Sequence, residues 1–172
     1  MTELNAPNAA DMDALGQALG RSLQDGAVVY LHGQLGAGKT TLVRGVLKGL
    51  GFDGRVRSPT YTLVEGYEIG GHQLYHLDLY RICGPEEMEY LGARDLDDPS
   101  LWLFAEWPEH GEGRLPVPDL VLNFEMREPG RLIRAEPRSG RGEELTRAWL
   151  ARMRTIPGSE ANPNRLDSKV KL

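Results

Sequence analysis

A chain of 172 residues, 40% of them hydrophobic and 26% charged, is long enough to bury one core and too short for two full domains, so we expect one domain over residues 1–156. It has no apolar stretch near the roughly 20 residues that span a bilayer, and its polar start lacks the basic and apolar blocks of a secretory signal, so we expect a cytoplasmic protein without membrane contact. The formal net charge of -5 argues against DNA binding, because duplex affinity depends on neutralising phosphates.

The first part of the chain predicts a helix, a buried strand, a glycine-rich loop and a second helix. Apolar residues recur at three- and four-residue spacing from Asp11, which can cap a helix, to Gly26, which can end it. Residues 28–31 are short, β-branched or aromatic and apolar on both faces, as expected of a central parallel strand. Helical periodicity resumes after Lys39 and stops at Gly51.

A hairpin and a second buried strand follow. Residues 61–69 alternate between apolar and polar, residues 70–71 are a Gly-Gly turn, and residues 74–79 make the return strand. The acidic segment 84–100 predicts a short helix and then a loop. The apolar run 101–105 is a second candidate for a buried strand.

The C-terminal third predicts another hairpin and a helix. Residues 120–126 alternate between apolar and polar, a Pro-Gly turn follows, and residues 132–136 return. A helix is expected over residues 143–154. Residues 157–172 are polar and rich in Asn, Ser and Pro, so we expect a disordered tail.

Charge is distributed unevenly between the body of the chain and this last part. Residues 1–126 hold 9 Lys and Arg against 19 Asp and Glu, whereas residues 127–154 hold 8 Arg against 4 Glu. Contact with RNA or an acidic partner would account for the Arg-rich end. A solvated helix face and hairpin would also account for it, and this is the commoner case.

The strongest motif lies between the first buried strand and the second helix. The pattern G-x-x-x-x-G-K-[ST] is met by Gly33, Gln34, Leu35, Gly36, Ala37, Gly38, Lys39 and Thr40. In this context it is a P-loop, whose backbone N–H groups and helix N-terminus face phosphates. Lys39 would reach the β- and γ-phosphates and the Thr40 hydroxyl would ligate Mg²⁺. The guanine-reading pattern Asn/Thr-Lys-x-Asp is absent from the sequence, so we expect ATP as the nucleotide.

With a P-loop in place, the order of elements predicts the fold class. We expect an α/β domain of the P-loop NTPase type, with a mixed sheet that is parallel at its centre, antiparallel hairpins at its edges and helices around it. Residues 1–156 would form this single P-loop ATPase domain.

A P-loop also needs a carboxylate at the end of a neighbouring strand, to hold the metal and orient the attacking water. Glu106 directly follows the apolar run 101–105, and Asp78 lies in an otherwise apolar strand. An isolated strand-end acid serves salt bridging or capping as often as function, but beside a P-loop we favour function for both.

Weaker candidates carry ordinary structural interpretations. Ser58 and Thr60 could present hydroxyls to the γ-phosphate as a switch segment does, although an ordinary turn explains them as well. The four histidines show no metal-ligand spacing and Cys83 has no partner in the sequence, so we interpret these side chains as structural or surface groups.

Four motifs together resemble the TsaE (YjeE) family of bacterial tRNA threonylcarbamoyladenosine biosynthesis ATPases. They are the loop extended to Thr41, and the segments 58–64, 76–81 and 106–108, in the family's order and spacing over roughly residues 10–135. The resemblance implies a weak ATPase that joins the TsaB–TsaD heterodimer. That machinery attaches a threonylcarbamoyl group to adenosine 37 of tRNAs reading codons that begin with A. The ATPase would reach tRNA indirectly and gate assembly and release of the complex.

The resemblance also implies roles for individual residues. Glu106 would help to hold Mg²⁺ together with Thr40, and Asp78 would be needed for hydrolysis. Trp107 would lie near the nucleotide, and Arg131 would approach it. The family usually has Asp where this chain has Gln34. We expect this side chain to point away from the phosphates. The implied nucleotide-binding set also includes Lys39, Thr41, Ser58 and Thr60.

Two rival functions remain open. One is a small-molecule P-loop kinase, which usually carries an Arg-rich lid, whereas residues 84–100 contain six Asp or Glu and one Arg. The other is a module that uses nucleotide to gate assembly without hydrolysing it.

Overall fold

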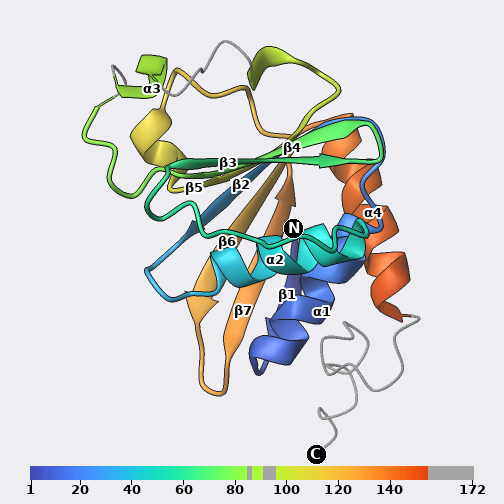
Figure 1. Ribbon diagram of the computed structural model, residues 1–172. Helices are drawn as coiled ribbons and strands as arrows, with labels where there is room; N and C mark the ends of the chain where they lie inside the picture. Colours follow the sequence, from blue (N-terminus) through green and yellow to red (C-terminus); the bar gives the residue numbers. More distant parts are fainter. Residues whose placement is uncertain (85–86, 91–95, 155–172) are drawn as a thin grey trace, which may run out of the picture.

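The computed structural model describes residues 1–84, 87–90 and 96–154, and in this part of the chain seven strands form one sheet in the order β1-β7-β6-β2-β5-β4-β3 (Figure 1). The strands are β1 (Thr2–Ala6), β2 (Ala27–Gly33), β3 (Val64–Ile69), β4 (His72–Asp78), β5 (Trp102–Glu106), β6 (Leu120–Met126) and β7 (Arg131–Pro137). The helices are α1 (Ala9–Gly20), α2 (Lys39–Gly49), α3 (Glu87–Tyr90), the 3₁₀ helix η2 (Pro108–Gly111) and α4 (Gly140–Arg154).

The sheet is parallel at its centre and antiparallel at both edges, as predicted. Strands β6, β2, β5 and β4 run parallel to one another, while β3 pairs antiparallel with β4, β7 with β6, and β1 with β7. Helices α1, α2 and α4 cover one face of the sheet and bury the larger core, and α3 with neighbouring loops covers the other (Figure 1). The predicted α/β class is therefore confirmed.

The first helix differs from its prediction at both ends. It begins at Ala9, because the side chain of Asn8 accepts a hydrogen bond from the backbone N–H of Asp11 at 3.0 Å. Asn8 is thus the cap, and Asp11 lies in the first turn. The helix ends at Gly20 rather than near Gly26.

Two strands also differ from expectation. β1 (Thr2–Ala6) was not predicted, and it extends the sheet by pairing with β7. β3 begins at Val64, because a turn closed by the Leu63 N–H on the Pro59 carbonyl precedes it. Tyr61, in the segment expected to belong to this strand, lies before it and is 86% exposed.

Some predictions concern residues that the structure leaves out. The expected tail over residues 157–172 lies outside the described residues, as do parts of the expected acidic helix, at 85–86 and beyond Tyr90. Among the helices that are described, none has the length and apolar character that a membrane span requires.

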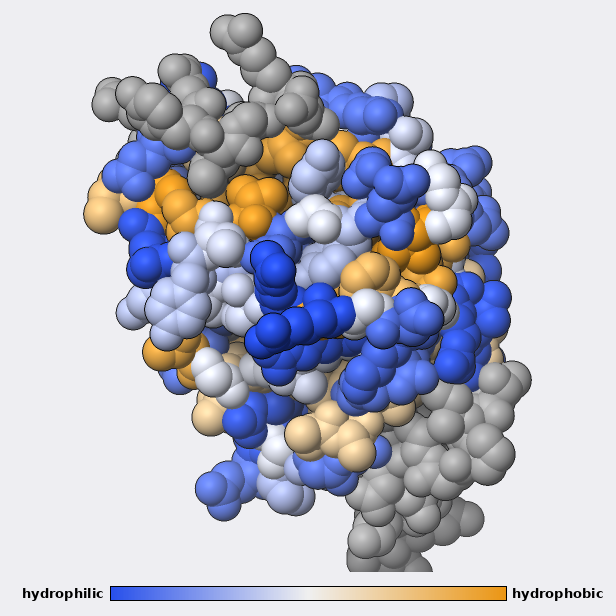
Figure 2. Space-filling view, viewed as in Figure 1, coloured by the Kyte–Doolittle hydropathy of each residue, from blue (hydrophilic) through white to orange (hydrophobic). Residues whose placement is uncertain are grey.

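Helices α1 and α2 pack backbone against backbone through glycines. A Cβ on Gly16 would lie 2.2 Å from the Leu42 carbonyl oxygen, and one on Gly45 would lie 2.5 Å from that of Asp13. Gly20 and Gly49 repeat this arrangement one turn further along each helix. A larger residue at these positions would push the helices apart, so the glycines fix where α2 lies on the sheet. The outer face of α2 is polar, and Figure 2 shows hydrophilic residues across the middle of this face of the molecule.

Replacing Gly45 by Ala should destabilise the protein although Ala is the better helix former. The added methyl group would meet the Asp13 carbonyl, and overpacking of this kind costs about 1–3 kcal/mol. Gly140→Ala is the matched control, because a Cβ there has no neighbour within 4 Å, and it should change the free energy of unfolding by less than about 0.5 kcal/mol. Urea unfolding measures both, and equal stability of the two variants would contradict the prediction.

Candidate functional site

The glycine-rich loop turns the end of β2 into the start of α2. Gly36 (φ 76°) and Gly38 (φ 101°) have left-handed backbones that favour glycine. A Cβ on Gly33 would lie 2.8 Å from both the Cβ and the carbonyl oxygen of Phe124, so the loop leaves the sheet against β6. A Cβ on Gly36 would meet nothing within 4 Å. The loop therefore has free space beside Gly36, and it leads into the N-terminus of α2, where backbone N–H groups can bind an anion.

Lys39 is folded back onto this loop. Its side-chain Nζ donates to the carbonyl oxygens of Gly33 at 2.5 Å and Gln34 at 2.9 Å. It also lies 4.3 Å from the centre of the Trp107 ring, a cation–π contact. Trp107 directly follows β5 and has a left-handed backbone (φ 57°), which places its ring over the lysine.

The ammonium group of Lys39 is buried, with 4% of the residue exposed. Burial lowers its pKa, and the neighbouring carboxylates of Glu106, Asp78 and Glu109 partly oppose that shift. The loop thus holds a cation at some energetic cost, which an anionic ligand would relieve.

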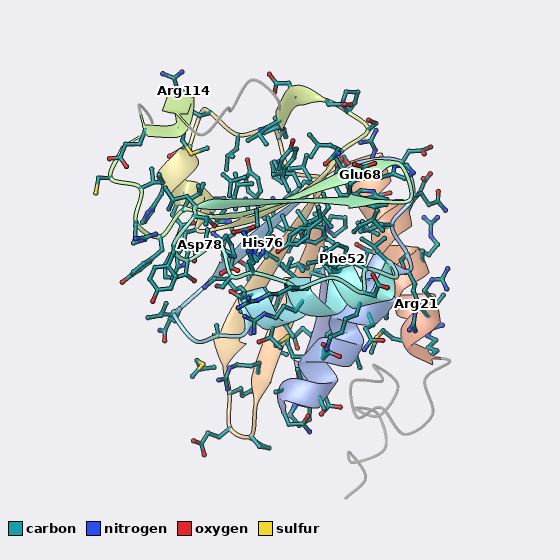
Figure 3. The ribbon with its side chains drawn as sticks, in the orientation of Figure 1. Arg21, Phe52, Glu68, His76, Asp78 and Arg114 are labelled. Carbon is teal, nitrogen blue, oxygen red and sulfur yellow. The ribbon has the colours of Figure 1, made fainter. Side chains whose placement is uncertain are left out.

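Two carboxylates lie side by side at the carboxyl end of the sheet. Strands β4 and β5 are parallel, and their register pairs Asp78 with Glu106, so the predicted acids end neighbouring strands. The hydroxyl of Thr40 and Nε2 of His76 both hydrogen-bond Oε1 of Glu106, at 2.7 and 2.9 Å. Asp78 accepts a hydrogen bond from the backbone N–H of Tyr80 at 3.1 Å. Figure 3 labels His76 and Asp78 near the end of β4.

This donor set fits Mg²⁺ bound together with a phosphate ligand. Among the described residues no group of three or more His, Cys, Asp or Glu could hold a metal ion alone. Mg²⁺ in nucleotide sites usually takes one or two carboxylates and fills its remaining positions with phosphate oxygens and waters. Thr40 and Glu106 supply a hydroxyl and a carboxylate that lie next to each other, with the two oxygens 2.7 Å apart.

A pocket of about 270 Å³ adjoins the loop on its outer side. It lies between the segment Ala6–Met12, the loop residues 36–38, Thr41 and the β6–β7 turn. Arg131 crosses from that turn to the loop, where Nη2 donates to the Gly36 carbonyl at 3.2 Å. The predicted residues Thr41 and Arg131 therefore lie together at this pocket.

Of the remaining predicted residues, two are exposed and two contact each other. Gln34 and Leu35 are exposed at the tip of the loop. Ser58 and Thr60 hydrogen-bond each other at 2.7 Å in the segment before β3.

Sequence reasoning missed one buried site residue, His76, and treated it as structural. The signal was present, because residues two apart on a strand share a face, and His76 is two residues before Asp78.

The comparison with protein families matches this chain to one family. The sequence model described as "Threonylcarbamoyl adenosine biosynthesis protein TsaE" matches residues 6–133. That range includes the glycine-rich loop, both carboxylates and Arg131.

Individual relatives give the same result. The tRNA threonylcarbamoyladenosine biosynthesis protein TsaE of Haemophilus influenzae is 46% identical over 122 residues, covering 71% of this chain and 77% of that protein. The protein of the same name from Synechocystis is 44% identical over 118 residues, covering 66% and 72%. The crystal structure of YdiB from Bacillus subtilis superposes with a TM-score of 0.68 at 27% identity, covering 86% of this chain and 92% of that one.

The burial of Lys39 predicts that Lys39→Met stabilises the protein without ligand, by about 1 kcal/mol near neutral pH. Because the folded pKa of Lys39 lies below its ordinary value of 10.5, the unfolded chain binds more protons between these two values. Wild-type stability therefore rises with pH in that window, and the advantage of Lys39→Met should shrink toward pH 10.5.

Urea unfolding of both proteins between neutral pH and pH 10.5 checks this. Burial raises the pKa of Tyr30 to about 12, but Tyr30 titrates in both proteins and cancels in their difference. Lower stability of Lys39→Met across the range would show that the contacts of the ammonium outweigh its desolvation.

Proposed function

The chain belongs to the TsaE family of threonylcarbamoyl adenosine biosynthesis proteins, and from this premise we propose that it binds ATP with Mg²⁺ at residues 33–41 and hydrolyses it. The family's role is in the biosynthesis of tRNA threonylcarbamoyladenosine. The observation that carries the proposal is the hydrogen bond from Thr40 to Glu106, which brings the P-loop hydroxyl to a strand-end carboxylate.

Phosphate binding would proceed by exchange. Lys39 would give up the carbonyl oxygens of Gly33 and Gln34 and turn its ammonium toward the phosphates, while the loop N–H groups donate hydrogen bonds to the anion. When bound, Mg²⁺ supplies charge neutralisation to the phosphates. Thr40 and Glu106 are the residues that would hold it.

Asp78 is the residue proposed to support hydrolysis. It is 8% exposed and ends β4 beside Glu106. A carboxylate so placed can orient a water molecule and accept its proton. Its own hydrogen bond, from Tyr80 N–H, fixes the orientation of the carboxylate.

The pocket of about 270 Å³ would receive the nucleoside. It opens beside Thr41, next to the loop where the phosphates would bind. Its walls are largely apolar or backbone, which suits the flat face of a purine. Adenine follows from the sequence, which lacks the guanine-reading pattern.

The activity would be coupled to a larger complex. We propose slow hydrolysis by the protein alone and faster hydrolysis with TsaB and TsaD, with tRNA contacted indirectly through them. Exposed apolar side chains near the site, such as Leu35 at 71% and Tyr61 at 86% exposure, leave surface that a protein partner can cover.

ATP hydrolysis by the wild type and two variants, each alone and with purified TsaB and TsaD, tests the proposal. Lys39→Ala should lose nucleotide binding. Asp78→Asn should keep ATP binding but lower kcat by about 100-fold, because the water loses its proton acceptor. Asp53→Asn, in an exposed loop after α2, is the control and should match the wild type.

The rival functions predict different results. ADP formation that requires a small-molecule acceptor would indicate a kinase. If Asp78→Asn supports tRNA modification as well as the wild type does, nucleotide acts only as an assembly signal. Absence of both ATP binding and complex formation would refute the proposal.

The contact between Arg131 and the loop generates a separate prediction. Arg131→Ala should weaken ATP binding by about tenfold, the equivalent of one charge-assisted hydrogen bond. Arg127→Ala, four residues earlier in the same hairpin and exposed, should leave the affinity unchanged. Isothermal titration calorimetry measures both, and equal affinities would exclude a role of Arg131 at the nucleotide.

A further inference from the structure

His76 is a fully buried polar side chain in the middle of the site. It is 0% exposed, and Nε2 hydrogen-bonds Oε1 of Glu106 at 2.9 Å. Its second ring nitrogen, Nδ1, has no hydrogen-bond partner among the described residues. Burying an imidazole with one nitrogen unpaired costs stability, so the residue calls for a role beyond filling space.

The hydrogen bonds around Glu106 indicate which nitrogen of His76 is the donor. Oε1 of Glu106 receives the Thr40 hydroxyl at 2.7 Å as well as the imidazole. A carboxylate oxygen has two lone pairs, so both neighbours can act as donors to it. An ionised carboxylate can only accept, so in its contact with Glu106 the Nε2 atom of His76 is the donor.

An imidazole N–H can orient Glu106 through one directed hydrogen bond. Lysine or arginine at this position would instead place a full positive charge against the carboxylate and compete with a metal ion for it.

We propose that His76 is a positioning residue for Mg²⁺: its Nε2–H fixes Oε1 of Glu106 against Thr40 and leaves Oε2 for the ion or its waters. The inference rests on the proposed function. Strand geometry supports it, since His76 precedes Asp78 by two residues on β4, and Asp78 pairs in register with Glu106. Supporting hydrogen bonds of this kind typically change metal affinity by about 10–100-fold.

The experiment measures ATP binding by calorimetry in EDTA and over a series of Mg²⁺ concentrations, for variants at position 76. His76→Phe keeps a ring and removes the donor. The Mg²⁺ concentration that half-saturates binding should rise by about 10–100-fold, while ATP affinity in EDTA stays unchanged. His76→Gln places an amide N–H at similar reach and should restore most of the loss.

His72→Phe is the matched control, because His72 lies on the same strand and its ring stacks on Trp102 at 4.6 Å instead of contacting Glu106. It should bind Mg²⁺ as the wild type does. If His76→Phe does not fold, His76→Asn replaces it, since its amide is one bond too short for Oε1. A higher half-saturating Mg²⁺ concentration in His76→Asn than in His76→Gln then supports the proposal.

The outcomes separate this inference from the proposed function. Failure of the wild type to bind ATP would refute the proposed function itself. ATP binding by all proteins with the same Mg²⁺ dependence in Phe or Asn as in the wild type would refute the role of His76 alone.

Discussion

The hydrogen bond of 2.7 Å from Thr40 to Glu106 joins the first turn of α2 to the end of β5, and it depends on three separate features. The parallel register must place the end of β5 close to the end of β2, and the pairing of Glu106 with Leu31, two residues before Gly33, does so. The left-handed glycines must turn the chain sharply into α2. The helix must then be held close to the sheet. An error in any of these would separate the hydroxyl from the carboxylate. The distance between the Thr40 and Glu106 oxygens therefore depends on the fold of the whole domain.

The third feature explains why both helices contain glycines where alanine would favour helix formation. Gly16 and Gly45 let the backbones touch, and close-packed interiors yield little to strain. These glycines fix the position of α2 against α1, and they do so at some cost in helix stability. Because α2 begins at Lys39, any change in the contact between α1 and α2 would also move the residues proposed to bind phosphate.

The candidate site residues that depend on local pattern could be chosen from the sequence. The loop could be predicted because its spacing is fixed by backbone chemistry, and Glu106 because it ends an apolar run. β1 could not, since it owes its existence to pairing with β7, more than 120 residues away, and five residues carry little periodicity of their own. The contact of Trp107 with Lys39 depends on a left-handed backbone in a non-glycine residue, which no spacing rule indicates.

The folded-back lysine sets a condition on any ligand. Lys39 already has two carbonyl acceptors and the Trp107 ring, so the net gain from a phosphate is the difference between new contacts and those given up. Trp107 leads directly into η2, whose Glu109 carboxylate contacts His32 of β2 at 3.1 Å. Displacement of this segment would therefore change what holds the lysine. If the contact with Lys39 stabilises this position of the segment, a ligand that draws Lys39 away removes that stabilisation by the same free energy. Ligand binding at the loop would then change the conformation of a segment at the protein surface. Such a change is what coupling of a nucleotide to an assembly requires.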